Sequence, residues 1–82
     1  MSDAQDYNVS PRVLRYSRHA EQRLQERNIS KSDAEEAYRN PDITHPDEKG
    51  NACYVKHFPD GRRVEVVVRA DSEPPFVITV MD

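Results

Sequence analysis

The sequence has a single cysteine, Cys53, no tryptophan and two glycines among its 82 residues. One cysteine excludes an internal disulfide and cannot by itself build a structural zinc site. Two glycines leave no room for a glycine-rich nucleotide-binding loop. The longest nearly apolar run, Phe76–Met81, is too short to span a bilayer. These absences favour a protein of the reducing cytoplasm that makes no membrane contact.

The formal net charge of -3 conceals an uneven distribution of charge along the chain. Residues 11–31 hold six basic and two acidic side chains, and residues 52–70 hold four and two. The net charge excludes a uniformly basic coat for nucleic acid, but the two positive segments predict a local basic patch if the fold joins them. An ordinary mixture of solvated charges is the alternative.

The apolar residues change in kind along the chain, which predicts helices first and strands second. Both leucines lie in the first half, and seven of the nine valines follow Tyr54. Ser17 is a suitable N-cap for a helix running to about Arg27, and Ser30 for a second helix that ends before Pro41. Short extended segments are expected at residues 13–16 and near Ile43.

Three strands are predicted in the second half, at residues 52–58, residues 62–70 and Phe76–Met81. Pro59-Asp60-Gly61 joins the first two as a hairpin. In the middle strand Val64, Val66 and Val68 are expected to face the helices, with Glu65 on an exposed face. The fold class is therefore α+β, with two N-terminal helices packed on a three- to four-stranded antiparallel sheet. Residues 12–82 form one domain after a disordered tail at residues 1–11.

The first predicted helix carries a stripe of His19, Arg23 and Arg27 at spacings of i, i+4 and i+8 along one border of its apolar face. Arginine presents a planar fork that matches phosphate oxygens, and histidine titrates near neutral pH. The stripe therefore fits phosphate binding with proton transfer. The alternative is that the arginines pair with acidic neighbours and His19 fills a half-buried gap.

The strand at residues 52–58 alternates two kinds of side chain. Tyr54, Lys56 and Phe58 form an aromatic–cation–aromatic ladder that is able to stack on bases and hold phosphate. Alternatively, the two rings pack under a helix and Lys56 reaches the rim. Cys53 and His57 share the other face and offer two soft metal ligands. Without CxxC or HExxH spacing, we expect neither a metal site nor a cofactor.

A longer pattern in this sequence resembles a known family. Residues 17–30 read S-x-H-A-x-x-R-L-x-x-R-x-I-S, which is similar to the opening of a small prokaryotic domain family grouped with RelE- and BrnT-like ribonuclease toxins. The resemblance extends over about residues 16–81. It implies a compact RelE-like sheet with two N-terminal helices, and RNA cleavage.

The first hypothesis for function is therefore a metal-independent endoribonuclease of RelE-like toxin type. Its substrate would be RNA, including ribosome-bound message, and its protein partner would be an antitoxin-like protein. Such chemistry needs a base, an acid and cations at the phosphorane. The candidate catalytic residues are His19, Arg23, Arg27, Lys56 and His57. The candidate RNA-binding residues are Arg15, Tyr54 and Arg63. The second hypothesis is a non-catalytic binding or regulatory module that retains the fold.

Overall fold

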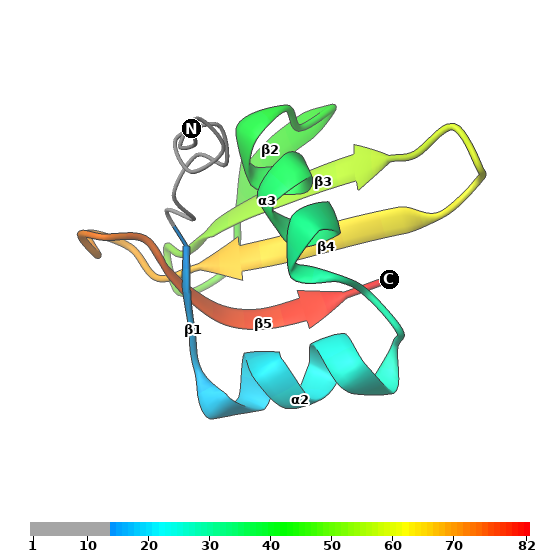
Figure 1. Ribbon diagram of the computed structural model, residues 1–82. Coiled ribbons are helices and arrows are strands. Elements are labelled where there is room, and N and C mark those ends of the chain that lie inside the picture. Colours follow the sequence, from blue (N-terminus) through cyan, green and yellow to red (C-terminus); the bar gives the residue numbers. More distant parts are fainter. Residues whose placement is uncertain (1–13) are drawn as a thin grey trace, which may run out of the picture.

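The computed structural model describes residues 14–82, so the tail predicted at residues 1–11 lies outside the described residues. In chain order the elements are β1 (Arg15–Tyr16), α2 (Arg18–Glu26), α3 (Lys31–Arg39), β2 (Ile43–Pro46), β3 (Ala52–His57), β4 (Arg63–Val68) and β5 (Phe76–Met81) (Figure 1). Two nine-residue helices thus precede most of the sheet, and the α+β class is confirmed.

Both predicted helix caps are present. The backbone N–H of Ala20 donates to Ser17 Oγ at 2.9 Å, and that of Asp33 donates to Ser30 Oγ at 3.0 Å. Each serine thereby satisfies one of the backbone donors that the first turn of a helix leaves unpaired. The Ser17 hydroxyl also donates to the carbonyl of Ile78 in β5 at 2.8 Å. Ser17 therefore starts α2 and fastens it to the sheet.

Substitution of the two capping serines should lower the free energy of unfolding by different amounts. Ser30→Ala removes one cap and should lower the free energy of unfolding by about 1 kcal/mol. Ser17→Ala removes a cap and leaves the half-buried Ile78 carbonyl without its donor, so we expect about 2 kcal/mol. Urea denaturation of both variants measures the difference. Equal costs would contradict a fastening role for the Ser17 hydroxyl.

The sheet has five strands in the order β1-β5-β4-β3-β2. The expectation of an entirely antiparallel sheet with three to four strands is wrong, because β1 pairs with β5 in parallel. The backbone N–H of Arg15 donates to the Pro75 carbonyl at 2.9 Å, and that of Ser17 donates to the Val77 carbonyl at 3.0 Å. The chain therefore runs alongside the start of β5 before it turns into α2. The other three strand pairs are antiparallel, as predicted.

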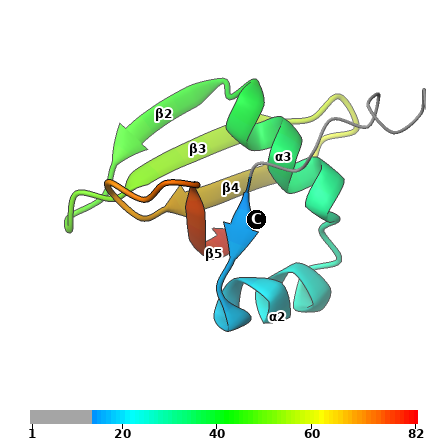
Figure 2. The same cartoon turned by 60° about the vertical axis from the view of Figure 1, so that its left-hand side comes forward.

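One face of the sheet packs against both helices. Val64, Val66 and Val68 of β4 belong to the buried core together with Leu24, as predicted. Figures 1 and 2 show α3 lying across β3 and β4, and α2 lying along β5. No helix of residues 14–82 covers the opposite face, which we call the open face.

The position of Glu65 differs from the expectation. Glu65 points to the open face, as the alternation predicts, yet it is 7% exposed. Its Oε1 accepts a hydrogen bond from Arg63 Nη2 at 2.7 Å. Cys53, Val55 and Val67, its neighbours on the open face, are also buried, and the segment between β2 and β3 and the end of β5 border a hollow there. The expected exposure of Glu65 is therefore wrong.

Two aspartates accept backbone hydrogen bonds at the ends of strands. Asp42 Oδ2 accepts from the backbone N–H of His57 at 2.7 Å, and Asp60 Oδ1 accepts from that of Arg62 at 3.1 Å. These hydrogen bonds are the main reason that the pKa of each carboxyl lies below its ordinary value of 3.8.

A lowered pKa in the folded state predicts a loss of stability in acid. The contribution of Asp42 and Asp60 is complete above the unfolded pKa and disappears as the pH falls through the lower folded pKa. We therefore expect the free energy of unfolding to fall below about pH 5. The double variant Asp42→Asn/Asp60→Asn should show a shallower fall in denaturation experiments at stepped pH. An identical slope in wild type and the double variant would show that these two carboxyl groups do not cause the loss of stability.

Neither helix in the described part of the chain has the length and apolar character needed to cross a membrane.

Candidate functional site

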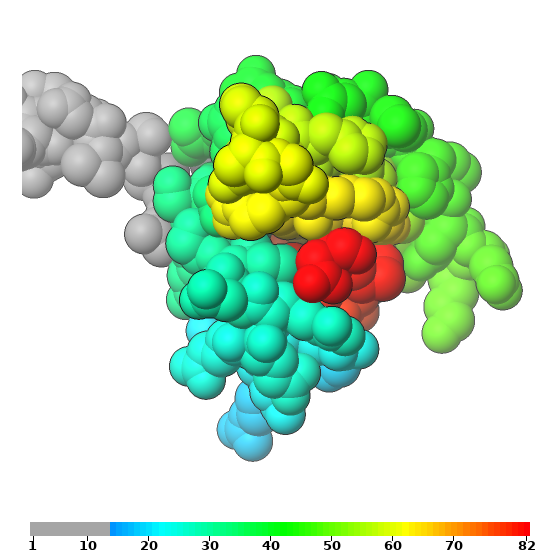
Figure 3. All heavy atoms as spheres, turned by 90° about the vertical axis from the view of Figure 1, so that its right-hand side faces the viewer, coloured from blue at the N-terminus to red at the C-terminus, as the bar shows by residue number. Residues whose placement is uncertain are grey.

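The two positive segments of the sequence meet at a hollow of about 300 Å³ beside Asp82. We call it the arginine hollow, and its lining residues are Arg27, Asn28, Ile29, Arg62, Arg63, Val64 and Asp82. Figure 3 shows the end of the chain, in red, between the β3–β4 connection in yellow and the end of α2 in blue-green. The fold therefore brings the two basic segments together at one hollow, where their arginines also contact acidic residues.

Arg27 and Arg63 approach the same residue from two sides of the arginine hollow. Arg27 Nη1 lies 3.7 Å from Asp82 Oδ1, and Arg63 Nη1 donates to the Asp82 backbone carbonyl at 3.4 Å. Their side chains are 45% and 42% exposed. A guanidinium has five N–H donors, so these contacts, and that of Arg63 to Glu65, occupy only part of its capacity. Both arginines are able to accept an anionic ligand.

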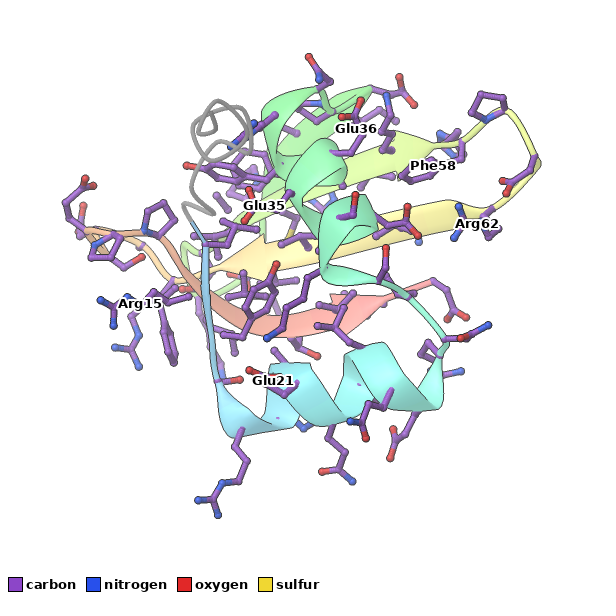
Figure 4. The ribbon with its side chains drawn as sticks, in the orientation of Figure 1. Arg15, Glu21, Glu35, Glu36, Phe58 and Arg62 are labelled. Atoms are coloured by element: carbon purple, nitrogen blue, oxygen red, sulfur yellow. The ribbon has the colours of Figure 1, made fainter. Side chains whose placement is uncertain are left out.

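The Arg62 guanidinium is bound by two carboxylates of the same protein. Arg62 Nη1 lies 2.7 Å from Asp33 Oδ2, and Arg62 Nε lies 2.8 Å from Asp60 Oδ2. These hydrogen bonds, first that of Asp33, raise the pKa of the guanidinium above its ordinary value. Its guanidinium carbon also lies 5.0 Å from the centre of the Phe58 ring, close to it in Figure 4. Arg62 therefore connects the hairpin to α3 and leaves ligand binding to Arg27 and Arg63.

The rest of the predicted α2 stripe lies away from the arginine hollow. His19 is exposed, and it is not among the residues lining the hollow. Arg23 Nη1 lies 3.7 Å from Glu26 Oε1 on the same helix. Arg23 Nε is buried and has no hydrogen-bond partner among the described residues. Of the three stripe residues, only Arg27 reaches the hollow.

Tyr54 and Lys56 lie beneath α3. The Tyr54 ring meets the Tyr38 ring edge-on, with 4.9 Å between centroids. Lys56 Nζ donates to the Asn40 carbonyl at 3.1 Å and lies 3.8 Å from Glu36 Oε2. The alternative in which these side chains pack under a helix therefore describes Tyr54 and Lys56, since both point toward α3.

His57 and Arg15 occupy two further places. His57 is exposed, and its Nδ1 lies 3.5 Å from Asp42 Oδ2. Arg15 lines a separate hollow of about 800 Å³ between β1, α3 and the segment before β5. Figure 4 shows Arg15 and Arg62 at opposite ends of the molecule. Among the predicted site residues, the structure thus brings together Arg27 and Arg63 at the arginine hollow, and His57 and Arg63 as direct cross-strand partners.

The open face carries a cluster that the sequence pattern does not predict. One ligand-type atom from each of His45, Cys53 and Glu65 lies within 4.8 Å of the others. The sequence pairs Cys53 with His57, because both have the same parity in one strand. The register of β2 against β3 instead places His45 directly opposite Cys53. The register of β2 against β3 is the signal that identifies the cluster, and it joins two strands that are separate segments of the sequence.

Comparison with known families matches residues 16–82 to one described as a domain of unknown function (DUF4258). Comparisons with curated proteins and with solved structures find no match. These findings provide no link to RelE- or BrnT-like toxins, so that resemblance stays an expectation from the sequence. The matched segment runs from β1 to the end of the chain. It includes the arginine hollow and the cluster of His45, Cys53 and Glu65. The chain therefore belongs to the DUF4258 family.

Proposed function

We propose that this chain is a small RNA-binding module that holds a phosphate group of the RNA at the arginine hollow. The observation that carries the proposal is the approach of Arg27 and Arg63 to one hollow from two different basic segments. A guanidinium binds phosphate through two parallel hydrogen bonds, which fixes the position of the phosphate as well as its charge. Two guanidinium groups at one hollow therefore favour a phosphate-bearing ligand.

The same hollow favours binding over cleavage. Asp82 supplies the one carboxylate of its lining, and no histidine is among the lining residues. Cleavage at a ribose 2′-hydroxyl uses a base together with an acid for the leaving oxygen. His19 and His57, the predicted proton-transfer groups, are exposed outside this lining. The endoribonuclease and toxin hypotheses therefore stay predictions, and the binding module is the function that we propose.

Acidic neighbours make the binding weak and dependent on salt. Asp82 and Glu65 already contact the two arginines, and the chain carries a formal net charge of -3. An incoming phosphate therefore competes with the Asp82 carboxylate for Arg27. We expect detectable binding at low ionic strength that declines steeply as salt is added.

Anisotropy of a fluorescent single-stranded RNA tests this proposal through matched arginine variants. Arg27→Ala and Arg63→Ala should each weaken binding about tenfold and reduce the slope of log K against log salt. Arg18→Ala removes an equal charge from the exposed surface of α2, away from the hollow, and serves as the control. It should bind within about twofold of wild type.

Gel analysis of the same samples, with a chelator present, reports any cleavage. Equal weakening by all three variants would contradict a specific site and indicate general charge attraction. Cleavage that His19→Ala abolishes would favour the endoribonuclease hypothesis instead. Absence of binding by wild type at low salt would overturn the proposal.

A further inference from the structure

The cluster of His45, Cys53 and Glu65 lies on the open face, on three neighbouring strands. His45 of β2 and Cys53 of β3 are direct cross-strand partners. Glu65 of β4 is paired with Val55, so it lies diagonally across from Cys53 on the same face. Diagonal neighbours in a sheet are within reach of a long side chain. A hollow of about 400 Å³, lined by all three residues, opens above them.

The hydrogen bonding of His45 leaves one ring nitrogen directed at the cluster. Its Nδ1 lies 3.2 Å from the backbone carbonyl of Pro46, and its Nε2 lies 3.9 Å from Glu65 Oε2. Nε2 is therefore the ring nitrogen that faces the Glu65 carboxylate. A metal-binding histidine commonly donates its other ring N–H to a backbone carbonyl, as the position of Nδ1 allows here.

Glu65 is held in place by a partner outside the cluster. Its Oε1 accepts from Arg63 Nη2 at 2.7 Å, while its Oε2 is directed toward His45. The Glu65 side chain is 10% exposed, so its orientation is fixed by packing as well as by Arg63. Metal-ligating carboxylates are commonly oriented by a hydrogen bond of this kind to the oxygen that does not bind the metal.

We propose that His45 Nε2, Cys53 Sγ and Glu65 Oε2 bind one zinc ion, with the fourth coordination position open to the hollow. A nitrogen, a thiolate and a carboxylate oxygen are all ligands that zinc accepts, and three protein ligands with one open position are typical of zinc sites that hold water or substrate. With bonds of about 2.0–2.3 Å, tetrahedral ligand atoms lie about 3.3–3.7 Å apart. The three ligand atoms lie within 4.8 Å of one another, with His45 Nε2 3.9 Å from Glu65 Oε2, so zinc binding draws them closer together.

Zinc binding at this cluster is coupled to the loss of the Cys53 thiol proton, because the thiolate is the form of cysteine that binds a metal. On binding, zinc forms the bond to sulfur, and the thiol proton leaves to solvent. The bound ion is then balanced by the thiolate and the Glu65 carboxylate, with His45 neutral.

Titration of the reduced, metal-free protein with zinc, followed by competition with a coloured chelator, tests the proposal. We expect one zinc per chain with a Kd at or below about 1 µM. Cobalt substituted for zinc should give the thiolate charge-transfer absorption of a cobalt–sulfur bond. Cys53→Ser should remove that absorption. Failure of wild type to bind either metal would overturn the site.

Two histidine variants decide the assignment of the nitrogen ligand. His45→Ala should weaken zinc binding by at least about 100-fold, and circular dichroism should confirm that this exposed substitution leaves the fold intact. His57→Ala is the matched control, since His57 is also exposed, and it should bind zinc as wild type does. Equal affinity in wild type and His45→Ala would refute the proposal, as would a loss of binding in His57→Ala. His45 does not line the arginine hollow, so His45→Ala should leave RNA binding unchanged and separates this site from the proposed function.

Discussion

Truncation of Leu24 to alanine should lower the free energy of unfolding by about 3 kcal/mol. Leu24 is 5% exposed and is the large aliphatic side chain through which α2 enters the core beneath β5. The substitution removes buried apolar surface and leaves a cavity that the surrounding strands fill incompletely. A chain of this length has a total stability of about 4–12 kcal/mol, so the loss is a large fraction of it.

Gln25→Ala is the matched control for this prediction, because Gln25 is an exposed neighbour on the same helix. We expect its unfolding free energy to stay within about 0.5 kcal/mol of wild type. Guanidinium denaturation monitored by circular dichroism measures both. A small effect at Leu24, or a larger one at Gln25, would mean that α2 is rotated relative to the packing described here.

Tyr54→Ala should also cost about 3 kcal/mol, and it should leave RNA affinity unchanged. The Tyr54 ring packs against Tyr38 of α3 and against the buried core. Removing it creates a cavity and ends an edge-on aromatic contact. Tyr54→Phe keeps the ring and should stay within about 0.5 kcal/mol of wild type.

The Tyr54 variants also separate two interpretations of the residue. A base-stacking platform would lose affinity for RNA on substitution while the protein kept most of its stability. A core residue loses stability on substitution, while the RNA affinity of the folded protein is unchanged. We expect denaturation to show the loss at Tyr54→Ala, and anisotropy on the protein that remains folded to show unchanged RNA binding. A stable but binding-deficient Tyr54→Ala would restore Tyr54 to the RNA-binding site.

The features that the sequence predicts correctly depend on short-range chemistry. Ser17 and Ser30 mark their helices, because a cap is decided within three residues. Pro59-Asp60-Gly61 joins β3 and β4, because turn geometry is decided within the turn itself. Alternation in β4 identifies the face of Val64, Val66 and Val68, because the side-chain period of a strand is two.

The features that the sequence does not predict depend on which distant segments become neighbours. The parallel pairing of β1 with β5 joins segments about sixty residues apart, and no local pattern encodes it. His45 approaches Cys53 through a cross-strand register, and Glu65 lines a hollow together with residues of the segment between β2 and β3. In the candidate site, the charge distribution predicts that Arg27 and Arg63 share a surface. It does not predict that His19 lies elsewhere, because helical spacing alone does not say which part of a stripe meets a hollow.

The central claim, that RNA phosphate binds at the arginine hollow, is tested most directly by chemical-shift mapping on isotope-labelled protein titrated with a short single-stranded RNA. We expect the largest shifts on the side-chain and backbone signals of Arg27, Asn28, Arg63 and Asp82, and we expect added salt to reverse them. Largest shifts at His19, or at Tyr54 and Lys56, with those at the hollow unchanged, would contradict it.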